Sequence, residues 1–360
     1  LVNTHFFYLL LIFLFSFFIN FYYSKFGTFP IDTFLHYDTG FRILNNEFPV
    51  RDYWIVSGFI IDFLQSIFFK IFGVNWFAYI FHSSLFNFII SLLSYYFFLS
   101  LNVSRFKSLI YTLSFATLAY TVSGTPFVDH HAVFFLLIST YLIITALNYP
   151  KKSYLWVLIV IMFFLSFLSK QVPTFYVALS QGVIILYILI KKKNYNIFKI
   201  ILISFIAFII FFLLLLTYLN IDISLFYTQY LDYPRTIGFE RYDKFGKSFE
   251  IFFNQYKFLF LPIIVIIILK LKKIKNKKIK FLSQEVINFL IILVFGMSLL
   301  FHQIMTKNQI FIYFLIPIFF ALLEQELTNF NFKYKKHLSI FLIFFIIFIS
   351  LKYHERFNET

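Results

Sequence analysis

The chain has 360 residues, of which 61% are apolar, 24% aromatic and only 13% charged, with 31 basic against 16 acidic side chains. Soluble domains carry roughly 45–50% apolar and about 25% charged residues, so this composition excludes a soluble globular protein and a disordered chain. The lack of cysteine excludes disulfides, thiolate metal sites and a cysteine nucleophile. A polytopic membrane protein remains, because apolar runs of about 18 residues recur along the chain.

These apolar runs predict eleven membrane-spanning helices. We expect them at residues 6–23, 76–101, 108–123, 132–148, 154–169, 172–190, 197–218, 251–269, 286–301, 309–323 and 338–351. The first run is too long for a signal peptide and lacks a small-residue cleavage site, so we interpret it as a span. The expected fold is all-α and polytopic. It is a single integrated membrane domain, in which 1–218 includes the long first outer loop (24–75) and 219–360 adds another outer loop and the C-terminal spans.

Basic residues gather in alternate loops between the predicted spans. One set of loops holds 18 of the 31 lysines and arginines against three acids, and its largest group runs from Lys270 to Lys280. Cytoplasmic loops carry such an excess. We therefore expect a multi-pass protein of the inner (cytoplasmic) membrane, with its N-terminus inside and its C-terminus outside. The basic charge is explained by this orientation and requires no nucleic acid as a partner.

Segment 59–72 is apolar enough to resemble a twelfth span. A polar stripe at helical spacing, which includes Asp62 and Gln65, instead predicts an amphipathic helix in the outer interface. A crossing at this point would move every later lysine cluster to the outside, against the orientation rule. We therefore expect a long first outer loop that carries interfacial helices.

Acidic residues fall mainly outside the spans: 13 of the 16 lie in the predicted outer loops. A transporter is expected to hold ionisable residues near mid-membrane, where each costs roughly 2.5–3.5 kcal/mol on insertion scales. The predicted spans are nearly free of charge. We therefore expect the chemistry at the outer face, in loops 24–75, 124–131 and 219–250.

The first outer loop contains the leading catalytic candidate, Asp32. It follows a proline at the start of a helical pattern, so it is either a catalytic carboxylate or an N-cap. Asp38 and Arg42 stand four residues apart on the same predicted helix, where they either bind substrate or pair with each other. Arg51 and Asp52 are adjacent in an aromatic setting, where they either bind substrate or form a structural ion pair.

The second outer loop ends in Asp129, His130 and His131 at the mouth of a span. A carboxylate and an imidazole at this place can hold a divalent cation such as Mg²⁺ or Mn²⁺, or an acceptor sugar. The structural alternative is a helix cap formed by Asp129. Adjacent histidine side chains diverge, so the candidate metal ligands are Asp129 and His130.

Three further polar positions lie between apolar spans. Lys170 and Gln171 form a turn where a compact ammonium suits a phosphate group, although a lysine near a span end also reaches to the interface for solvation. His302 lies in another outer turn and is a candidate contact for a lipid phosphate or a sugar. Arg235 and Arg241 in loop 219–250 form either a solvated face or a segment that closes over the acceptor.

The first loop resembles that of the GT-C class of polyprenyl-phosphate-sugar glycosyltransferases. This class includes the protein O-mannosyltransferases, the aminoarabinose transferases and the rhizobial lipopolysaccharide-core transferases. Its members often show an Asp-Glu pair, then an R-I-L turn, then R-D-[FY]-W. Asp32 corresponds to the first acid, and Thr33 stands where the second is usual. Residues 41–44 (FRIL) and 51–54 (RDYW) correspond to the two later elements.

The resemblance implies an inverting transferase that moves a sugar from a polyprenyl-phosphate donor to a glycolipid, lipopolysaccharide or protein acceptor at the outer face. It implies that Asp32 takes the acceptor's proton, that Asp129 supports a metal or acceptor site, and that Lys170 meets the donor phosphate. The sequence has no Rossmann fingerprint and no P-loop, as expected for a lipid donor.

Other functions are compatible with a polytopic chain that is basic inside. A flippase or transporter should carry charges along a central cavity, and the predicted spans do not. A polymerase or ligase of lipid-linked glycans usually depends on arginines in a large outer loop, which Arg235 and Arg241 provide. A membrane scaffold without catalytic activity is the third alternative.

Overall fold

The computed structural model describes residues 2–25, 32–120, 124–242, 253–280, 282–306, 312–328, 330 and 333–358, with the backbone alone at 2–3, 32, 238–242 and 356–358. Every regular element in these ranges is a helix, so the all-α expectation is confirmed. The helices are α1 (Val2–Tyr23), α2 (Asp32–Leu44), α3 (Phe59–Phe72), α4 (Trp76–Ser100), α5 (Arg105–Leu118), α6 (Val128–Asn148), α7 (Tyr154–Ser169), α8 (Gln171–Lys191), α9 (Tyr195–Tyr218), α10 (Ile223–Tyr227), the π-helix η2 (Thr228–Asp232), α11 (Tyr233–Tyr242), α13 (Lys257–Lys275), α14 (Gln284–Thr306), α15 (Leu315–Thr328) and α16 (Lys335–Asn358).

Each of the eleven predicted spans overlaps one of these helices. Seven helices among the described residues are long and apolar enough to cross a membrane, namely α1, α4, α6, α8, α9, α14 and α16. Helix α7 is apolar but shorter. The chain is therefore a multi-pass membrane protein, and the full number of eleven crossings stays a prediction.

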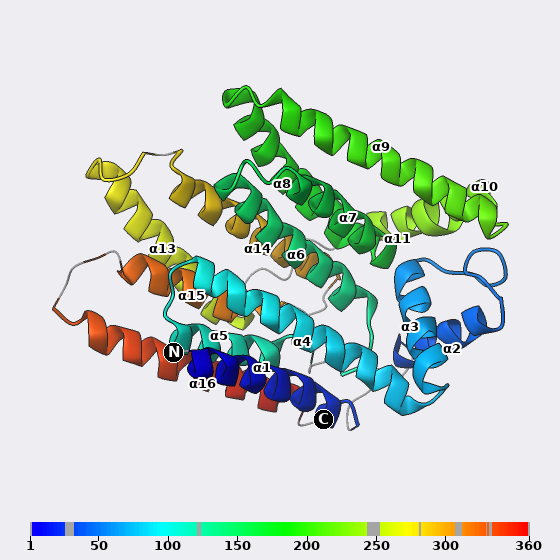
Figure 1. The fold of residues 1–360 in the computed structure, drawn as a ribbon, viewed down its shortest axis with the longest axis horizontal. Coiled ribbons are helices and arrows are strands. Elements are labelled where there is room, and N and C mark those ends of the chain that lie inside the picture. Colours follow the sequence, from blue (N-terminus) through cyan, green and yellow to red (C-terminus); the bar gives the residue numbers. More distant parts are fainter. Residues whose placement is uncertain are drawn as a thin grey trace.

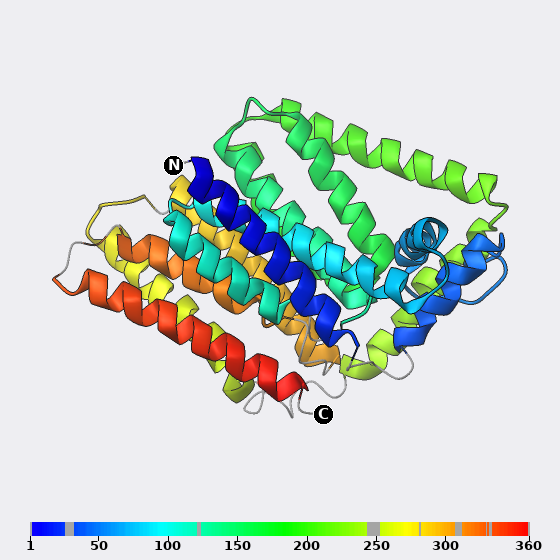
Figure 2. The same cartoon turned by 60° about the horizontal axis from the view of Figure 1, so that its bottom comes forward.

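The long helices lie side by side in one bundle (Figures 1 and 2). Helices α2, α3, α10 and α11 gather at one end, on the right in Figure 1. The C-terminal ends of α8 and α13 and the start of α16, which carry lysine clusters, lie at the opposite end. We name these the α2–α3 end and the lysine-rich end.

Helix α15 is the innermost helix of the bundle. Its residues 315–323 are all buried, and α5, α13 and α16 pack against it. Helix α9 differs from α15 in its burial. It packs mainly on α7 and leaves most of its apolar surface exposed. An exposed apolar helix of this length suits a lipid environment.

Helices α2 and α3 cross closely at Gly40, where a Cβ atom would lie 2.7 Å from Cγ of Gln65. The polar stripe of α3 faces the protein, because Asp62 and Gln65 are buried whereas Ile67 and Ile71 are exposed. An interfacial helix would turn such a stripe toward water, so the expectation for segment 59–72 is corrected in this respect. The buried polar groups find partners inside the protein, and the apolar face is left toward the surroundings.

Candidate functional site

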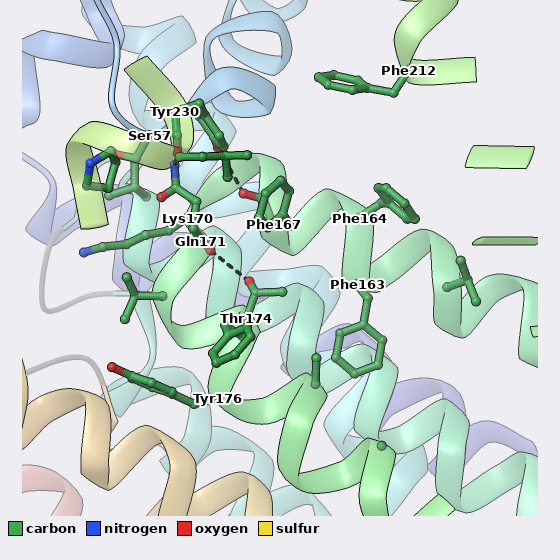
Figure 3. A pocket seen from close by; sticks show the side chains of 18 of the residues that line it. Ser57, Phe163, Phe164, Phe167, Lys170, Gln171, Thr174, Tyr176, Phe212 and Tyr230 are labelled. Atoms are coloured by element: carbon green, nitrogen blue, oxygen red, sulfur yellow. Dashed lines mark hydrogen bonds between the residues drawn. The ribbon is translucent and has the colours of Figure 1, made fainter. Parts of the chain in front are cut away.

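A cavity of about 1880 Å³ lies between α7, α8 and α9 and extends to the α2–α3 end. Its walls along the three helices are apolar, with side chains such as Trp156, Leu189 and Phe198. The charged and imidazole side chains among its described lining residues are His36, Asp129, Lys170 and Arg235. Figure 3 shows Lys170 and Gln171 close to Tyr230, with a series of phenylalanines leading away from them.

Asp129 is the centre of a buried charged cluster at the polar end of this cavity. Lys170 Nζ donates to its Oδ2 at 2.6 Å, and His302 Nε2 lies 3.1 Å from its Oδ1. Asp129 comes from the first turn of α6, whereas His302 lies near the end of α14. A buried carboxylate is costly unless it is paired, and here both oxygens have a partner. All three residues were predicted as site residues, and the structure brings them together.

Lys170 occupies a single extended residue between α7 and α8, with φ −157° and ψ 131°. The next side chain, Gln171, fixes this turn to two other segments. Its Nε2 donates to the carbonyls of Val56, between α2 and α3, and Tyr230, in η2, at 2.7 Å each. The predicted lysine–glutamine turn therefore lies against the segment that joins α2 and α3.

A second buried acid, Asp62 of α3, pairs with His36 of α2. His36 Nδ1 lies 2.9 Å from Oδ1 of Asp62, and the hydroxyl of Thr39 donates to the same oxygen. Burial raises the pKa of Asp62, and the hydrogen bond to His36 opposes this rise. This pair was not predicted from the sequence, where Asp62 was assigned to a surface stripe. The signal was available, since an acid in an otherwise apolar helix needs a partner when it is buried.

His130 and His131 point toward different neighbours, as expected for adjacent histidines. His131 Nε2 lies 3.0 Å from His82 Nε2, and its Nδ1 lies 2.9 Å from the hydroxyl of Tyr120. His130 stacks on the ring of Tyr120 with 4.8 Å between centroids. Neither lines the described part of the cavity. Over the ranges that the structure describes, no group of three histidine or acidic side chains is placed to hold a metal ion, so the metal site at Asp129 and His130 stays a prediction.

Asp38 and Arg42 pair on the outside of α2. Arg42 Nε lies 2.7 Å from Oδ2 of Asp38 and its Nη1 lies 3.0 Å from Oε2 of Glu47, and all three side chains are at least 40% exposed. Ion pairs this exposed contribute about 1 kcal/mol or less. Asp38 and Arg42 are not among the described residues that line the cavity.

Arg51 joins the segment between α2 and α3 to the end of α9. Its Nη1 donates to the carbonyl of Leu219 at 2.9 Å, and its Nη2 donates to that of Asn46 at 2.7 Å. Its Nε donates to Asp52 at 2.8 Å, which holds the pKa of this carboxyl below its ordinary value. This geometry matches the structural ion pair that the sequence left as an alternative, and the described cavity lining contains neither residue.

Asp32, the predicted catalytic acid, begins α2 four residues before His36. Its side chain lies outside the described residues, as does that of Arg241. The catalytic role of Asp32 therefore stays a prediction.

Comparison of the chain with protein families, with curated proteins and with solved structures finds no match.

Proposed function

We propose that this protein is an inverting glycosyltransferase of the GT-C kind. It would move a sugar from a polyprenyl-phosphate donor to a glycan, lipid or protein acceptor at the outer face of the inner membrane. The observation that carries the proposal is one cavity with a long apolar part and a lysine at its polar end. An amphiphilic donor has the same division, with an apolar chain and an anionic head.

The size of the cavity supports a large lipid substrate. Pockets for small molecules hold about 300–1,000 Å³, whereas this one holds about 1880 Å³. On α8 its lining runs from Gln171 to Leu189, which is roughly 27 Å at about 1.5 Å per residue. A lipid chain along this wall would leave its phosphate beside Lys170.

Lys170 is the candidate for stabilising the leaving phosphate. The acceptor oxygen attacks the anomeric carbon, the bond from that carbon to the phosphate oxygen breaks, and the phosphate keeps the electron pair. An ammonium has three N–H groups, and Asp129 accepts one of them, so as far as the described residues go two remain for phosphate oxygens. Removing a stabilising donor of this type lowers rates by roughly 10²–10³-fold. Asp129 and His302 would hold the ammonium in place, and Asp32 is the sequence's candidate for the base.

Arg235 of α11 favours a second candidate, a polymerase of lipid-linked glycans, because it lines the same cavity. Both functions would use a lipid-linked sugar donor that carries phosphate. They differ in the acceptor, which for a polymerase is another lipid-linked glycan.

The test is transfer by purified protein in liposomes. Radiolabelled polyprenyl-phosphate sugars and nucleotide sugars are offered in parallel with membrane acceptors, including lipid-linked glycans. We expect transfer only from the polyprenyl-phosphate donors, and a loss of at least about a hundredfold in Lys170→Met. Transfer from a nucleotide sugar without any from a polyprenyl donor would refute the proposal.

A further inference from the structure

His36 differs from two other buried histidines at the α2–α3 end in its hydrogen bonds and in its position beside the cavity. His82 and His131 use both ring nitrogens in hydrogen bonds, and the described cavity lining contains neither. His36 lines the cavity. Its Nδ1 bonds to Asp62, and its Nε2 makes no hydrogen bond to any described residue.

The imidazole of His36 is held from two sides. Asp62 is itself held, because Thr39 donates to Oδ1 and the hydroxyl of Tyr53 lies 3.4 Å from Oδ2. On the other side, Gly58 has φ +92°, and a Cβ atom there would lie 2.5 Å from Cε1 of His36. Only glycine combines this backbone conformation with so close an approach.

The hydrogen-bond partner of Nδ1 determines which tautomer the imidazole of His36 adopts, and therefore whether Nε2 can accept a proton. A carboxylate that accepts the Nδ1–H bond favours the tautomer in which Nε2 carries a lone pair. An imidazole oriented in this way is a general base, and the carboxylate stabilises the imidazolium that forms. The pair therefore has the parts of a proton-accepting dyad on the wall of the proposed substrate cavity.

We propose that His36 is the general base of the transfer reaction and that Asp62 is its positioning residue, an inference that rests on the proposed function. The acceptor hydroxyl gives its proton to Nε2 while its oxygen bonds to the anomeric carbon. The bond from this carbon to the donor phosphate breaks, and the electron pair leaves with the phosphate beside Lys170. The imidazolium then releases its proton to water. His36 thus takes the role that the sequence predicted for Asp32.

His36→Asn is the main test, because its amide can still donate to Asp62 but has no basic nitrogen. We expect kcat with the polyprenyl-phosphate donor to fall at least about a hundredfold. The Kd for that donor should stay within about threefold of wild type, because Lys170 is unchanged. Asp62→Asn should also lower kcat, and KM should stay unchanged. The matched control is His354→Asn, a buried histidine of α16 that the described cavity lining does not include.

The outcomes separate this inference from the proposed function. Lack of transfer by the wild-type protein refutes both. Transfer by the wild type together with near-normal kcat in His36→Asn, or with a parallel loss of donor binding in that variant, refutes the base assignment alone. A loss in Asp32→Asn at least as large as that in His36→Asn also refutes it and returns the role to Asp32. Size-exclusion chromatography checks folding, and His36→Gln replaces the asparagine variant if that variant aggregates.

Discussion

Both ends of the bundle contain buried lysine–carboxylate clusters, but only one of the clusters borders the cavity. At the lysine-rich end, Lys270 and Lys273 of α13 each pair with both Glu285 of α14 and Glu326 of α15. At the α2–α3 end, the pair is Lys170 and Asp129. The described cavity lining includes both residues of this second pair and none of the first group.

The difference between the clusters lies in what each lysine can still bind. Lys270 and Lys273 have two carboxylates each, and their side chains are only 6% and 8% exposed. Among the described residues Lys170 pairs with one carboxylate, and its side chain is 22% exposed. Burial of an ion pair is weak evidence for stability or for function. The remaining capacity for an anion, beside a cavity, distinguishes a candidate site from a closed structural cluster.

Lys170→Met should have the largest effect on activity. We expect turnover with a polyprenyl-phosphate donor to fall at least about a hundredfold, and donor affinity to fall less, because the ammonium meets more negative charge in the transition state. Methionine keeps much of the side chain's length. Steady-state kinetics and donor binding measure the two effects.

This variant also leaves Asp129 without its cation, and breaking a buried pair costs about 3–5 kcal/mol. The companion is therefore Lys170→Met with Asp129→Asn, which removes both charges. Its thermal stability in detergent should exceed that of the single variant while turnover stays low. Near-normal turnover in the double variant would show that the pair is structural.

Lys273→Met tests the other end of the comparison. Loss of this cation leaves Glu285 and Glu326 to share Lys270, so we expect a loss of stability of up to about 3 kcal/mol. Turnover per folded molecule should stay within about twofold of wild type. Thermal unfolding and active-site-normalised kinetics measure these quantities, and a turnover loss equal to that of Lys170→Met would remove the distinction between the two ends.

The apolar part of the cavity can be filled at Gly182 of α8. No heavy atom lies within 4 Å of a Cβ built there, so Gly182→Trp should fold and project into the cavity that Gly182 lines. We expect about tenfold weaker binding of long-chain donors and little change for a short-chain analogue. Leu179→Trp, at an exposed position on the same helix outside the described lining, is the matched control. Equal effects of the two substitutions would count against a lipid chain in this cavity.

The fold could be anticipated because apolar runs are local properties of the chain. Each of the eleven predicted segments overlaps a helix, since a long apolar segment in lipid must satisfy its backbone hydrogen bonds internally. The direction in which a helix faces is not local. Segment 59–72 was recognised as amphipathic, but its polar side faces α2 and α4, where Asp62 meets His36 and Gln65 meets His82.

The candidate site was anticipated in part for the same reason. Asp129, Lys170 and His302 were conspicuous because each is polar beside an apolar segment, yet their contacts span 41 and 173 residues of sequence. Such contacts depend on how the helices pack, which no spacing rule supplies. The pairing of His36 with Asp62 was missed because Asp62 was assigned to a polar stripe that faces water, whereas it faces α2.

Photolabelling tests the central claim, that the cavity between α7, α8 and α9 holds the chain of a lipid-linked donor. A polyprenyl phosphate with a diazirine near the end of its chain is bound to the protein in liposomes, irradiated and mapped by peptide mass spectrometry. We expect labels on cavity-lining residues of these three helices, such as Phe163, Leu186 and Phe205. An excess of unlabelled polyprenyl phosphate should abolish these labels, whereas those on lipid-exposed surfaces should persist. Competable labels confined to α13, α15 or α16, with none on α7, α8 or α9, would contradict the account.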